Sequence, residues 1–220
     1  MNKNLSFKAV IFDLDGTLLN TLTDIADSMN AILRSRGFPE HPVDQYKYFV
    51  GDGMETLVRR TIPEQYRNEK FINDCLSELK KEYSRRWNNK TIPYDGIEDL
   101  LTSLSEKNVP MAILTNKPHN FAVQTINCFL PRWEFPVILG AKPEIPKKPD
   151  PTGALLIADT LNIAPDKILY LGDTDTDMET ATRAGMYPVG ILWGFRNRDE
   201  LLRAGAKELI QTPTEVLRYF

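Results

Sequence analysis

Short runs of consecutive apolar residues alternate with longer amphipathic stretches over most of the chain. Each run is rich in Val, Ile or Leu, which is the pattern of strands that are buried on both faces of a parallel sheet. The runs that we interpret as strands are residues 9–14, 109–114, 137–139, 168–171 and 189–192. Strands that alternate with helices in this way predict an α/β fold with a doubly wound, Rossmann-type parallel sheet.

Two of the intervening helices have apolar positions at helical spacing and a start signal. The first follows Asp95, which we expect to cap its N-terminus. Its apolar positions are Ile97, Leu100, Leu101 and Leu104. The second begins behind Pro151, and its periodic positions are Leu155, Leu156, Asp159 and Leu161.

The alternation stops between about residue 22 and residue 89, where only helical periodicity remains. The three apolar stripes in this segment are Ile25, Met29, Ile32 and Leu33, then Leu57, Val58 and Ile62, then Phe71, Cys75, Leu76 and Leu79. We therefore expect an all-helical cap over residues 21–89, inserted into a core made of residues 1–20 and 90–220. Such an insertion would stand over the carboxyl ends of the strands, where these sheets bind ligands, and would be placed to act as a lid.

Composition and charge narrow the class of protein. The 220 residues are 42% hydrophobic and 26% charged, which is typical of a globular protein. The net charge is −3 and no long basic run is present, so we expect no nucleic-acid partner. Residues 1–9 do not have the pattern of a signal peptide, and no stretch is long enough to span a membrane. We expect a soluble, cytoplasmic monomer or homodimer, with Cys75 and Cys128 as buried free thiols.

Two acidic residues stand at the end of the first predicted strand, where the sequence reads Asp13-Leu14-Asp15-Gly16. Side chains two apart on a strand point to the same face, so we expect Asp13 and Asp15 to project together. Two carboxylates crowded in this way repel each other unless a cation or a proton lies between them. An Asp-Gly pair often merely ends a strand, but an apolar strand that leads into Asp-Leu-Asp-Gly-Thr disfavours that interpretation.

A second acidic cluster, formed by Asp173, Asp175 and Asp177, follows the predicted strand at residues 168–171. Parallel strands present their carboxyl ends at the same edge of a sheet, so this cluster can complete a site that Asp13 begins. Carboxylates at loop tips suit Mg²⁺, which prefers oxygen ligands. Asp173 lies directly at the strand end and is the better ligand, whereas we interpret Asp175 as a first-turn residue favoured by the helix dipole.

No softer metal is indicated, because His41 and His119 stand alone in the sequence. Two further segments carry groups that can bind a negatively charged phosphate. Thr115 and Asn116 offer a hydroxyl and backbone N–H groups at a strand end, although Thr-Asn is also ordinary turn chemistry. Lys148 stands in a loop between prolines, where a cation loses less entropy when it meets an anion; the alternative is a solvated basic turn.

Together these four segments resemble the haloacid dehalogenase superfamily (HAD superfamily), in the same order and at comparable spacing over nearly the whole chain. Within it, Asp13-Leu-Asp15-Gly-Thr-Leu is similar to the signature of the phosphatases. The resemblance implies a HAD-like core with a small helical cap. It also implies that Asp13 is the nucleophile and that Asp15 is the general acid and base.

The same resemblance implies the remaining roles. Thr115, Asn116 and Lys148 would bind the phosphoryl group of the substrate, and Lys148 would steady the charge of the nucleophile as well. The implied cofactor is Mg²⁺, held by the side chain of Asp13, the backbone carbonyl of Asp15 and the side chain of Asp173. Asp177 would act on the metal through water.

The resemblance extends to the phosphoglycolate phosphatase-like branch of the superfamily. Residues 49–53, followed by residues 57–60, are similar to the cap loop of that branch, and residues 115–118 are also typical of it. The Gly-Asp-Gly within the first segment can equally separate two cap helices. Position 52 is commonly Asn in the branch, and we expect the additional charge of Asp52 to weaken binding of a carboxylate-bearing substrate such as phosphoglycolate.

The resulting hypothesis is a Mg²⁺-dependent phosphatase that acts on a small phosphorylated metabolite through a phosphorylated Asp13. Asp15 would protonate the leaving alkoxide and then deprotonate the attacking water. The alternatives are a sugar-phosphate phosphomutase or a pyrophosphatase on the same core, and, more distantly, a non-catalytic binding protein. Dehalogenase and phosphonatase chemistry is disfavoured, because those relatives lack the acid and base that Asp15 supplies.

Overall fold

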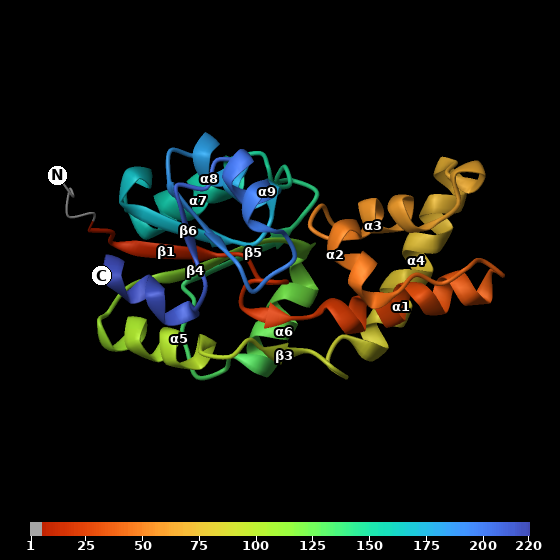
Figure 1. Cartoon of the computed structure of the whole chain (residues 1–220), viewed down its shortest axis with the longest axis horizontal. Coiled ribbons are helices and arrows are strands. Elements are labelled where there is room, and N and C mark those ends of the chain that lie inside the picture. Colours follow the sequence, from red (N-terminus) through yellow and green to blue (C-terminus); the bar gives the residue numbers. More distant parts are fainter. Residues whose placement is uncertain (1–5) are drawn as a thin grey trace.

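A six-stranded parallel sheet lies at the centre of the core in the computed structural model, which describes residues 6–220 (Figure 1). The strands are β1 (Ala9–Phe12), β4 (Met111–Pro118), β5 (Val137–Ala141), β6 (Ile168–Gly172), β7 (Tyr187–Ile191) and β8 (Glu208–Ile210). Their order is β5-β4-β1-β6-β7-β8, and each neighbouring pair runs parallel. The strand β1 therefore lies between β4 and β6, with the carboxyl ends of all three at one edge of the sheet.

Helices cover both faces of this sheet, because successive side chains of a buried strand point to opposite sides. Val10 and Phe12 of β1 belong to a hydrophobic cluster with α5 (Ile97–Glu106), α6 (His119–Phe129) and the C-terminal 3₁₀ segment Pro213–Tyr219. Ala9 and Ile11 pack on the other side with α7 (Thr152–Leu161) and α8 (Asp175–Arg183), beside which α9 (Arg198–Arg203) lies (Figure 1). The predicted α/β, doubly wound core is confirmed.

Each of the five predicted strands is present, with ends that differ by a few residues. The sequence interpretation missed β8, a three-residue edge strand whose sequence Glu208-Leu209-Ile210 is too short to carry a pattern. It also missed β2 (Leu19–Asn20) and β3 (Ile92–Pro93), which pair antiparallel. These two short strands lie where the chain leaves the core and returns to it.

The segment between β2 and β3, all of which the structure describes, contains only helices. They are α1 (Leu22–Ser35), α2 (Tyr46–Phe49), α3 (Met54–Thr61) and α4 (Glu69–Arg86), together with short 3₁₀ turns at Val43–Gln45 and Glu64–Tyr66. These helices share a hydrophobic cluster of their own, to which the core contributes Phe195. Figure 1 shows them beyond the end of the sheet, and we call them the cap helices. The exact division of the chain at residues 20/21 and 89/90 stays a prediction.

The start and the end of this helical segment are tied together by one buried carboxylate. Asp24, in the first turn of α1, accepts hydrogen bonds from the backbone N–H groups of Lys90 and Thr91 and from the hydroxyl of Thr91. A buried carboxylate with several donors is a strong local constraint. The two crossings between core and cap helices therefore lie side by side and are joined by charge-assisted hydrogen bonds.

The helix α7 turns a different face to the sheet from the one that the sequence predicted. Leu155 and Leu156 are 41% and 44% exposed. The residues of α7 that are buried are Gly153, Ala154, Ile157 and Ala158. A Cβ added at Gly153 would lie 2.8 Å from the side chain of Leu114, so the helix packs closely against β4. The prediction of this face was wrong because the small residues that permit the close contact carry less hydrophobic signal than the leucines opposite them.

Three smaller predictions also need correction. The N-cap of α5 is Gly96 rather than Asp95. In α4 the buried positions are Ile72, Cys75, Leu79 and Tyr83, whereas Phe71 and Leu76 of the predicted stripe are only partly buried against the same cluster as Cys75 and Leu79. Cys75 is buried as expected, but Cys128 is exposed.

Within residues 6–220, no helix is both long enough and apolar enough to cross a membrane. The signal-peptide prediction for residues 1–9 concerns, in its first five positions, residues outside the described part of the chain.

Candidate active site

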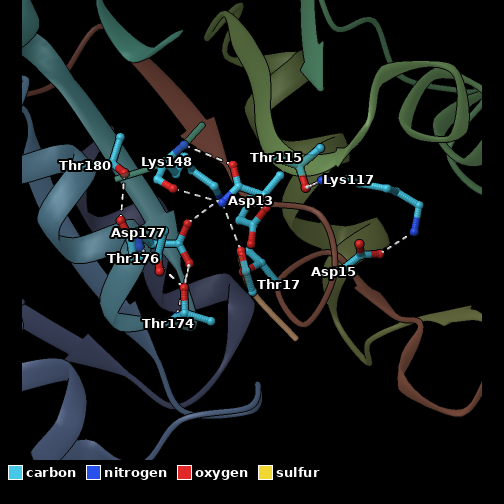
Figure 2. A network of polar contacts seen from close by, with 12 residues as sticks. Asp13, Asp15, Thr17, Thr115, Lys117, Lys148, Thr174, Thr176, Asp177 and Thr180 are labelled. Carbon is cyan, nitrogen blue, oxygen red and sulfur yellow. Dashed lines mark hydrogen bonds and ion pairs between the residues drawn. The ribbon is translucent and has the colours of Figure 1, made fainter. Parts of the chain in front are cut away.

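Three of the predicted site residues come from the carboxyl ends of three neighbouring strands, and Figure 2 labels two of them, Asp13 and Thr115. Asp13 follows β1 directly, Thr115 lies in β4, and Asp173 follows β6. The register pairs Phe12 with Ile113 on one side and with Leu171 on the other, which aligns these strand ends. The geometry therefore brings residues about 100 positions apart in the sequence to one edge of the sheet.

Three buried carboxylates form a cluster at this edge. Asp13, Asp173 and Asp177 each offer an oxygen atom, and these three atoms lie within 4.8 Å of one another. Asp173 accepts hydrogen bonds from the hydroxyl of Thr17 at 3.0 Å and from the backbone N–H of Phe195 at 2.8 Å. These bonds fix the orientation of the Asp173 carboxylate towards the other two.

Asp177 is held by the start of α8. Thr174 and Asp177 form a capping box, in which the Asp177 carboxylate accepts from the backbone N–H of Thr174 at 3.1 Å and from its hydroxyl at 2.6 Å. The site requires glycine at position 172, since a Cβ there would lie 2.2 Å from the Cβ of Asp177. Gly16 is equally constrained, with φ at +89° and a carboxylate oxygen of Asp173 2.3 Å from its hypothetical Cβ.

Lys148 provides the positive charge in this cluster. Its Nζ lies 2.6 Å from Oδ1 of Asp177 and 3.0 Å from Oδ1 of Asp13, and its side chain is only 2% exposed. The contact with Asp177 is a hydrogen bond. The contact with Asp13 lacks hydrogen-bond alignment, so Oδ1 of Asp13 is a buried oxygen that accepts no hydrogen bond.

The charges of the cluster do not balance, because three buried carboxylates face one ammonium group. Burial raises the pKa of Asp13 to about 7; Lys148 opposes this rise, and repulsion from Asp177 and Asp15 adds to it. Burial also raises the pKa of Asp173 well above its usual value, again with repulsion from Asp177 and Asp13. Burial disfavours the charge of Lys148, but Asp13 and Asp177 outweigh it and raise the pKa of Lys148.

This imbalance fits a divalent cation. The oxygen of Asp13 that accepts no hydrogen bond, the cluster of three carboxylate oxygens and the raised pKa values of Asp13 and Asp173 are the features expected where a hard cation supplies the missing charge. The donor set contains only oxygen atoms, which suits Mg²⁺ rather than a metal that prefers nitrogen or sulfur.

Asp15 lines the same cavity as Asp13 but has a different partner. Figure 2 shows its carboxylate beside Lys117, apart from the cluster that Asp13 forms with Asp177, so the expected convergence of the two carboxylates holds for the cavity but not for the cluster. Oδ1 of Asp15 lies 2.8 Å from Nζ of Lys117 (Figure 2). Asp15 is also not among the three carboxylates that lie within 4.8 Å of one another.

The side chain of Asn116 holds two loops in place. Its Nδ2 donates to the backbone carbonyls of Gly51 and Lys148, and its Oδ1 accepts from the backbone N–H of Lys148. The amide thus positions the Lys148 loop and contacts the cap helices. Thr115 is buried, and its hydroxyl accepts from the backbone N–H of Lys117 at 3.3 Å.

A cavity opens from this site between the sheet and the cap helices. It has about 580 Å³ of free space, including its open mouth. The core lines it with Asp13, Asp15, Thr115, Asn116, Lys117 and Pro118, and the cap side lines it with Ile25, Val50, Gly51, Gly53, Met54, Leu57, Leu79 and Tyr83. The cavity is charged at the strand ends and largely apolar on the cap side.

Two residues of this cavity were not singled out by the sequence analysis. Lys117 is buried, and its ammonium donates to Asp15 and to the hydroxyl of Tyr83 at 2.7 Å. Tyr83 lies on α4, about 34 positions away in the sequence. The signal that could have identified Lys117 is its place next to Thr115 and Asn116, where a charged residue stands near the end of a buried strand.

The loop before α3 meets the core beside the site. The carboxylate of Asp52 accepts from the hydroxyl of Thr176 at 2.9 Å and pairs with Arg60 at 2.6 Å. Asp52 does not line the cavity, although Gly51 and Gly53 do. Its charge is therefore paired with Arg60, and the expected weaker binding of a carboxylate-bearing substrate stays a prediction.

Comparison with known proteins gives a consistent result. The profile of the haloacid dehalogenase-like hydrolases matches residues 10–191. The phosphoglycolate phosphatase of Xanthomonas campestris is 30% identical over 214 residues, which cover 95% of this chain and 94% of that protein. The phosphoglycolate phosphatase of Aquifex aeolicus is 30% identical over 188 residues, which cover 86% of each chain.

Solved structures agree with these relatives. A protein from Lactobacillus delbrueckii subsp. bulgaricus matches with a TM-score of 0.90 and 30% identity, over 97% of each chain. A hydrolase of the haloacid dehalogenase-like family from Streptococcus pneumoniae matches with a TM-score of 0.87 and 26% identity, over 97% of this chain and 98% of that one.

The chain belongs to the haloacid dehalogenase-like hydrolases. It is an enzyme of the phosphatase type, a phosphoric monoester hydrolase similar to the phosphoglycolate phosphatases. The family and the class of enzyme that the sequence analysis predicted are both confirmed.

Proposed function

We propose that this protein hydrolyses phosphoglycolate or a similar small phosphomonoester, with Mg²⁺ as cofactor and Asp13 as the nucleophile. The observation that carries the proposal is the position of Asp13, a buried carboxylate at the end of β1 that lines the cavity and lies 3.0 Å from Lys148. The names of the relatives support phosphoglycolate as the first substrate to test.

In the proposed reaction, Asp13 attacks the phosphorus atom, and the leaving oxygen departs with a proton from Asp15. Asp15 lines the same cavity and would then take a proton from the water that hydrolyses the phosphorylated Asp13. Lys148 offsets the charge of the nucleophile, and Thr115 offers its hydroxyl to the phosphoryl group. The cap helices would limit access of bulk water during this sequence.

The side chains of Asp13 and Asp173 and the backbone carbonyl of Asp15 would hold Mg²⁺, with Asp177 acting through water. The bound ion would supply positive charge that offsets the repulsion between the carboxylates and the phosphate. A division of the chain into a core of residues 1–20 and 90–220 and a cap of residues 21–89 is part of the proposal. The cytoplasmic location and the monomeric or dimeric state stay predictions.

A phosphate-release assay tests this function directly. In the presence of Mg²⁺ we expect the highest kcat/KM for phosphoglycolate among a set that includes sugar phosphates, nucleotides and pyrophosphate, and we expect a chelator to stop the release. Transfer of phosphate between positions of a sugar, without net release, would favour the phosphomutase. A clear preference for pyrophosphate would favour the pyrophosphatase, and release that a chelator does not affect would contradict the metal dependence.

Mg²⁺ is also expected to stabilise the fold, because it offsets the excess charge of the buried carboxylates. At a concentration of about 100 times its dissociation constant, a ligand that binds only the folded state adds about 2.7 kcal/mol. For a protein of this size, the melting temperature should then rise by roughly 5–10 °C. Thermal unfolding with Mg²⁺ and with a chelator measures the difference without relying on activity.

Asp173→Asn provides the matched variant for this measurement. The Asn oxygen can accept from Phe195 and its amide can donate to Thr17, so the local bonds can be kept while one buried charge is removed. We expect this variant to be at least as stable as wild type in chelator and to gain little from Mg²⁺. Asp175→Asn, at an exposed position, should keep the full response. An equal response of Asp173→Asn and wild type would contradict the proposed metal site.

A further inference from the structure

Lys117 is the one Lys or Arg among the described residues that line the cavity. Its side chain is 3% exposed, and it lies where the charged strand ends meet the apolar surface of the cap helices. A lysine in such a place is costly to bury unless its ammonium has acceptors. The partners of this ammonium therefore indicate what it is placed to bind.

One of the three N–H donors of the Lys117 ammonium has no acceptor among the described residues. An ammonium group has three N–H donors, and within residues 6–220 the acceptors found for Lys117 are Asp15 Oδ1 at 2.8 Å and the Tyr83 hydroxyl at 2.7 Å. The carboxylate of Asp15 is the counter-charge of this buried ammonium. One N–H group of a buried cation is thus left for a ligand in the cavity.

Tyr83 offers a second donor at the same place. Its hydroxyl accepts from Lys117, and among the described residues no acceptor is found for its own proton. Burial raises the pKa of Tyr83, so the hydroxyl keeps that proton at neutral pH. The ring is fixed by an edge-to-face contact with Phe121 at 5.1 Å, which holds the hydroxyl at the wall of the cavity.

The other side chains that line the cavity from the cap side offer no hydrogen-bond donor to an anion. Ile25, Met54, Leu57 and Leu79 are apolar, and a charge placed against them would lose its hydration without gaining a partner. Two adjacent donors, one from the core and one from α4, are the arrangement that a carboxylate with two oxygen atoms can use at once.

We propose that Lys117 and Tyr83 together bind an anionic group on the leaving group of the substrate, so that these two residues set the preference for a leaving group that carries a carboxylate. This inference rests on the proposed function, because it assumes that the phosphoryl group lies at Asp13 and that Asp15 protonates the ester oxygen. It adds the two residues that select the leaving group.

The distances limit how long that leaving group is. Nζ of Lys117 is 2.8 Å from Asp15 Oδ1. If Asp15 makes a hydrogen bond to the ester oxygen through Oδ1, the ammonium lies at most about 6 Å from that oxygen, and if it does so through Oδ2, at most about 8 Å. A carboxylate on the carbon next to the ester oxygen fits within either span.

Two substrates and two variants test the inference. The substrates are phosphoglycolate and ethyl phosphate, which matches it in length but lacks the carboxylate. Wild type should prefer phosphoglycolate in kcat/KM. Since a hydrogen bond to a charged group is worth about 10- to 100-fold, Lys117→Met should lower kcat/KM for phosphoglycolate by roughly 100-fold and Tyr83→Phe by roughly 10-fold. Both variants should lower kcat/KM for ethyl phosphate much less, so the preference should collapse.

Several outcomes would overturn the inference. If Lys117→Met lowers kcat/KM by the same factor for both substrates, the role of Lys117 is to interact with Asp15 and not to bind the carboxylate. If Lys117→Met does not fold, Tyr83→Phe still decides, because it keeps the ammonium; an unchanged preference in Tyr83→Phe would then count against the inference. Tyr48→Phe, at a side chain that is 55% exposed on α2, is the matched control for the loss of a hydroxyl.

The failure of this inference differs from the failure of the proposed function. If wild type hydrolyses both esters equally well in the presence of Mg²⁺, the phosphatase function is supported and the carboxylate-binding site is contradicted. If wild type hydrolyses neither ester, the proposed function itself is contradicted.

Discussion

Asp13→Asn is expected to lower phosphate release by on the order of 10⁴-fold or more, which is the scale of loss when a covalent nucleophile is removed from a hydrolase. The amide nitrogen of Asn is a poor nucleophile, and no other carboxylate can take over. Asp173 and Asp177 are held by Thr17, Phe195 and Thr174, and Asp15 lies against Lys117. The fold should be kept, because the substitution removes one of three crowded negative charges.

The measurement compares kcat on phosphoglycolate with the far-ultraviolet circular dichroism and the melting temperature of the same preparations. Asp175→Asn is the matched control, since it makes the same chemical change two residues after Asp173 at an exposed position. Release by Asp13→Asn within about tenfold of wild type would refute Asp13 as the nucleophile, since a covalent nucleophile cannot be replaced so cheaply.

Lys148→Met is expected to destabilise the protein by about 3–5 kcal/mol in chelator, besides abolishing activity. The reason is that Lys148 is the ammonium in contact with both Asp13 and Asp177, and its removal leaves their buried charges without a counter-ion. Urea unfolding at constant pH measures the loss of free energy. Lys147→Met, one residue earlier at an exposed position, should change stability by no more than about 0.5 kcal/mol.

A double variant separates charge from packing in this experiment. Adding Asp13→Asn to Lys148→Met removes one of the charges that the first substitution leaves unpaired. We expect a favourable coupling of about 0.5–3 kcal/mol, the range for residues in direct contact. If the two effects simply add, the destabilisation of Lys148→Met comes from lost packing of the lysine stem, and the electrostatic explanation is wrong.

The core of the fold could be predicted because its strands are buried on both faces. The strand β1 reads Ala9 to Phe12 without a polar residue, and β6 is buried throughout, so neither segment could be taken for a loop. The edge strand β8 has three residues and only Ile210 buried, and it left no such pattern. The face of α7 was predicted wrongly because Gly153 and Ala154 permit close packing, and small size does not appear in a hydrophobic pattern.

The candidate site was predicted in part for an equally specific reason. Asp13 and Asp173 follow neighbouring parallel strands, and the rule that such strands end at one edge of the sheet predicts that the two residues lie close together, as they do. The partner of Asp15 was not predicted, because it is Lys117, to which the sequence analysis gave no role. The contact between Lys117 and Tyr83 could not be predicted from the sequence, because it joins β4 to a cap helix and follows from no local rule.

The sequence by itself determined the class of fold, the helical segment after the first strand and the acidic residues at the strand ends, because hydrophobic period and strand direction are local properties of the chain. Only the tertiary structure decided which partner each charged side chain has: Lys148 with Asp13 and Asp177, and Lys117 with Asp15 and Tyr83. The physical reason is that a charge buried away from water must find its counter-charge across the fold, and the distance along the chain says nothing about where that partner lies.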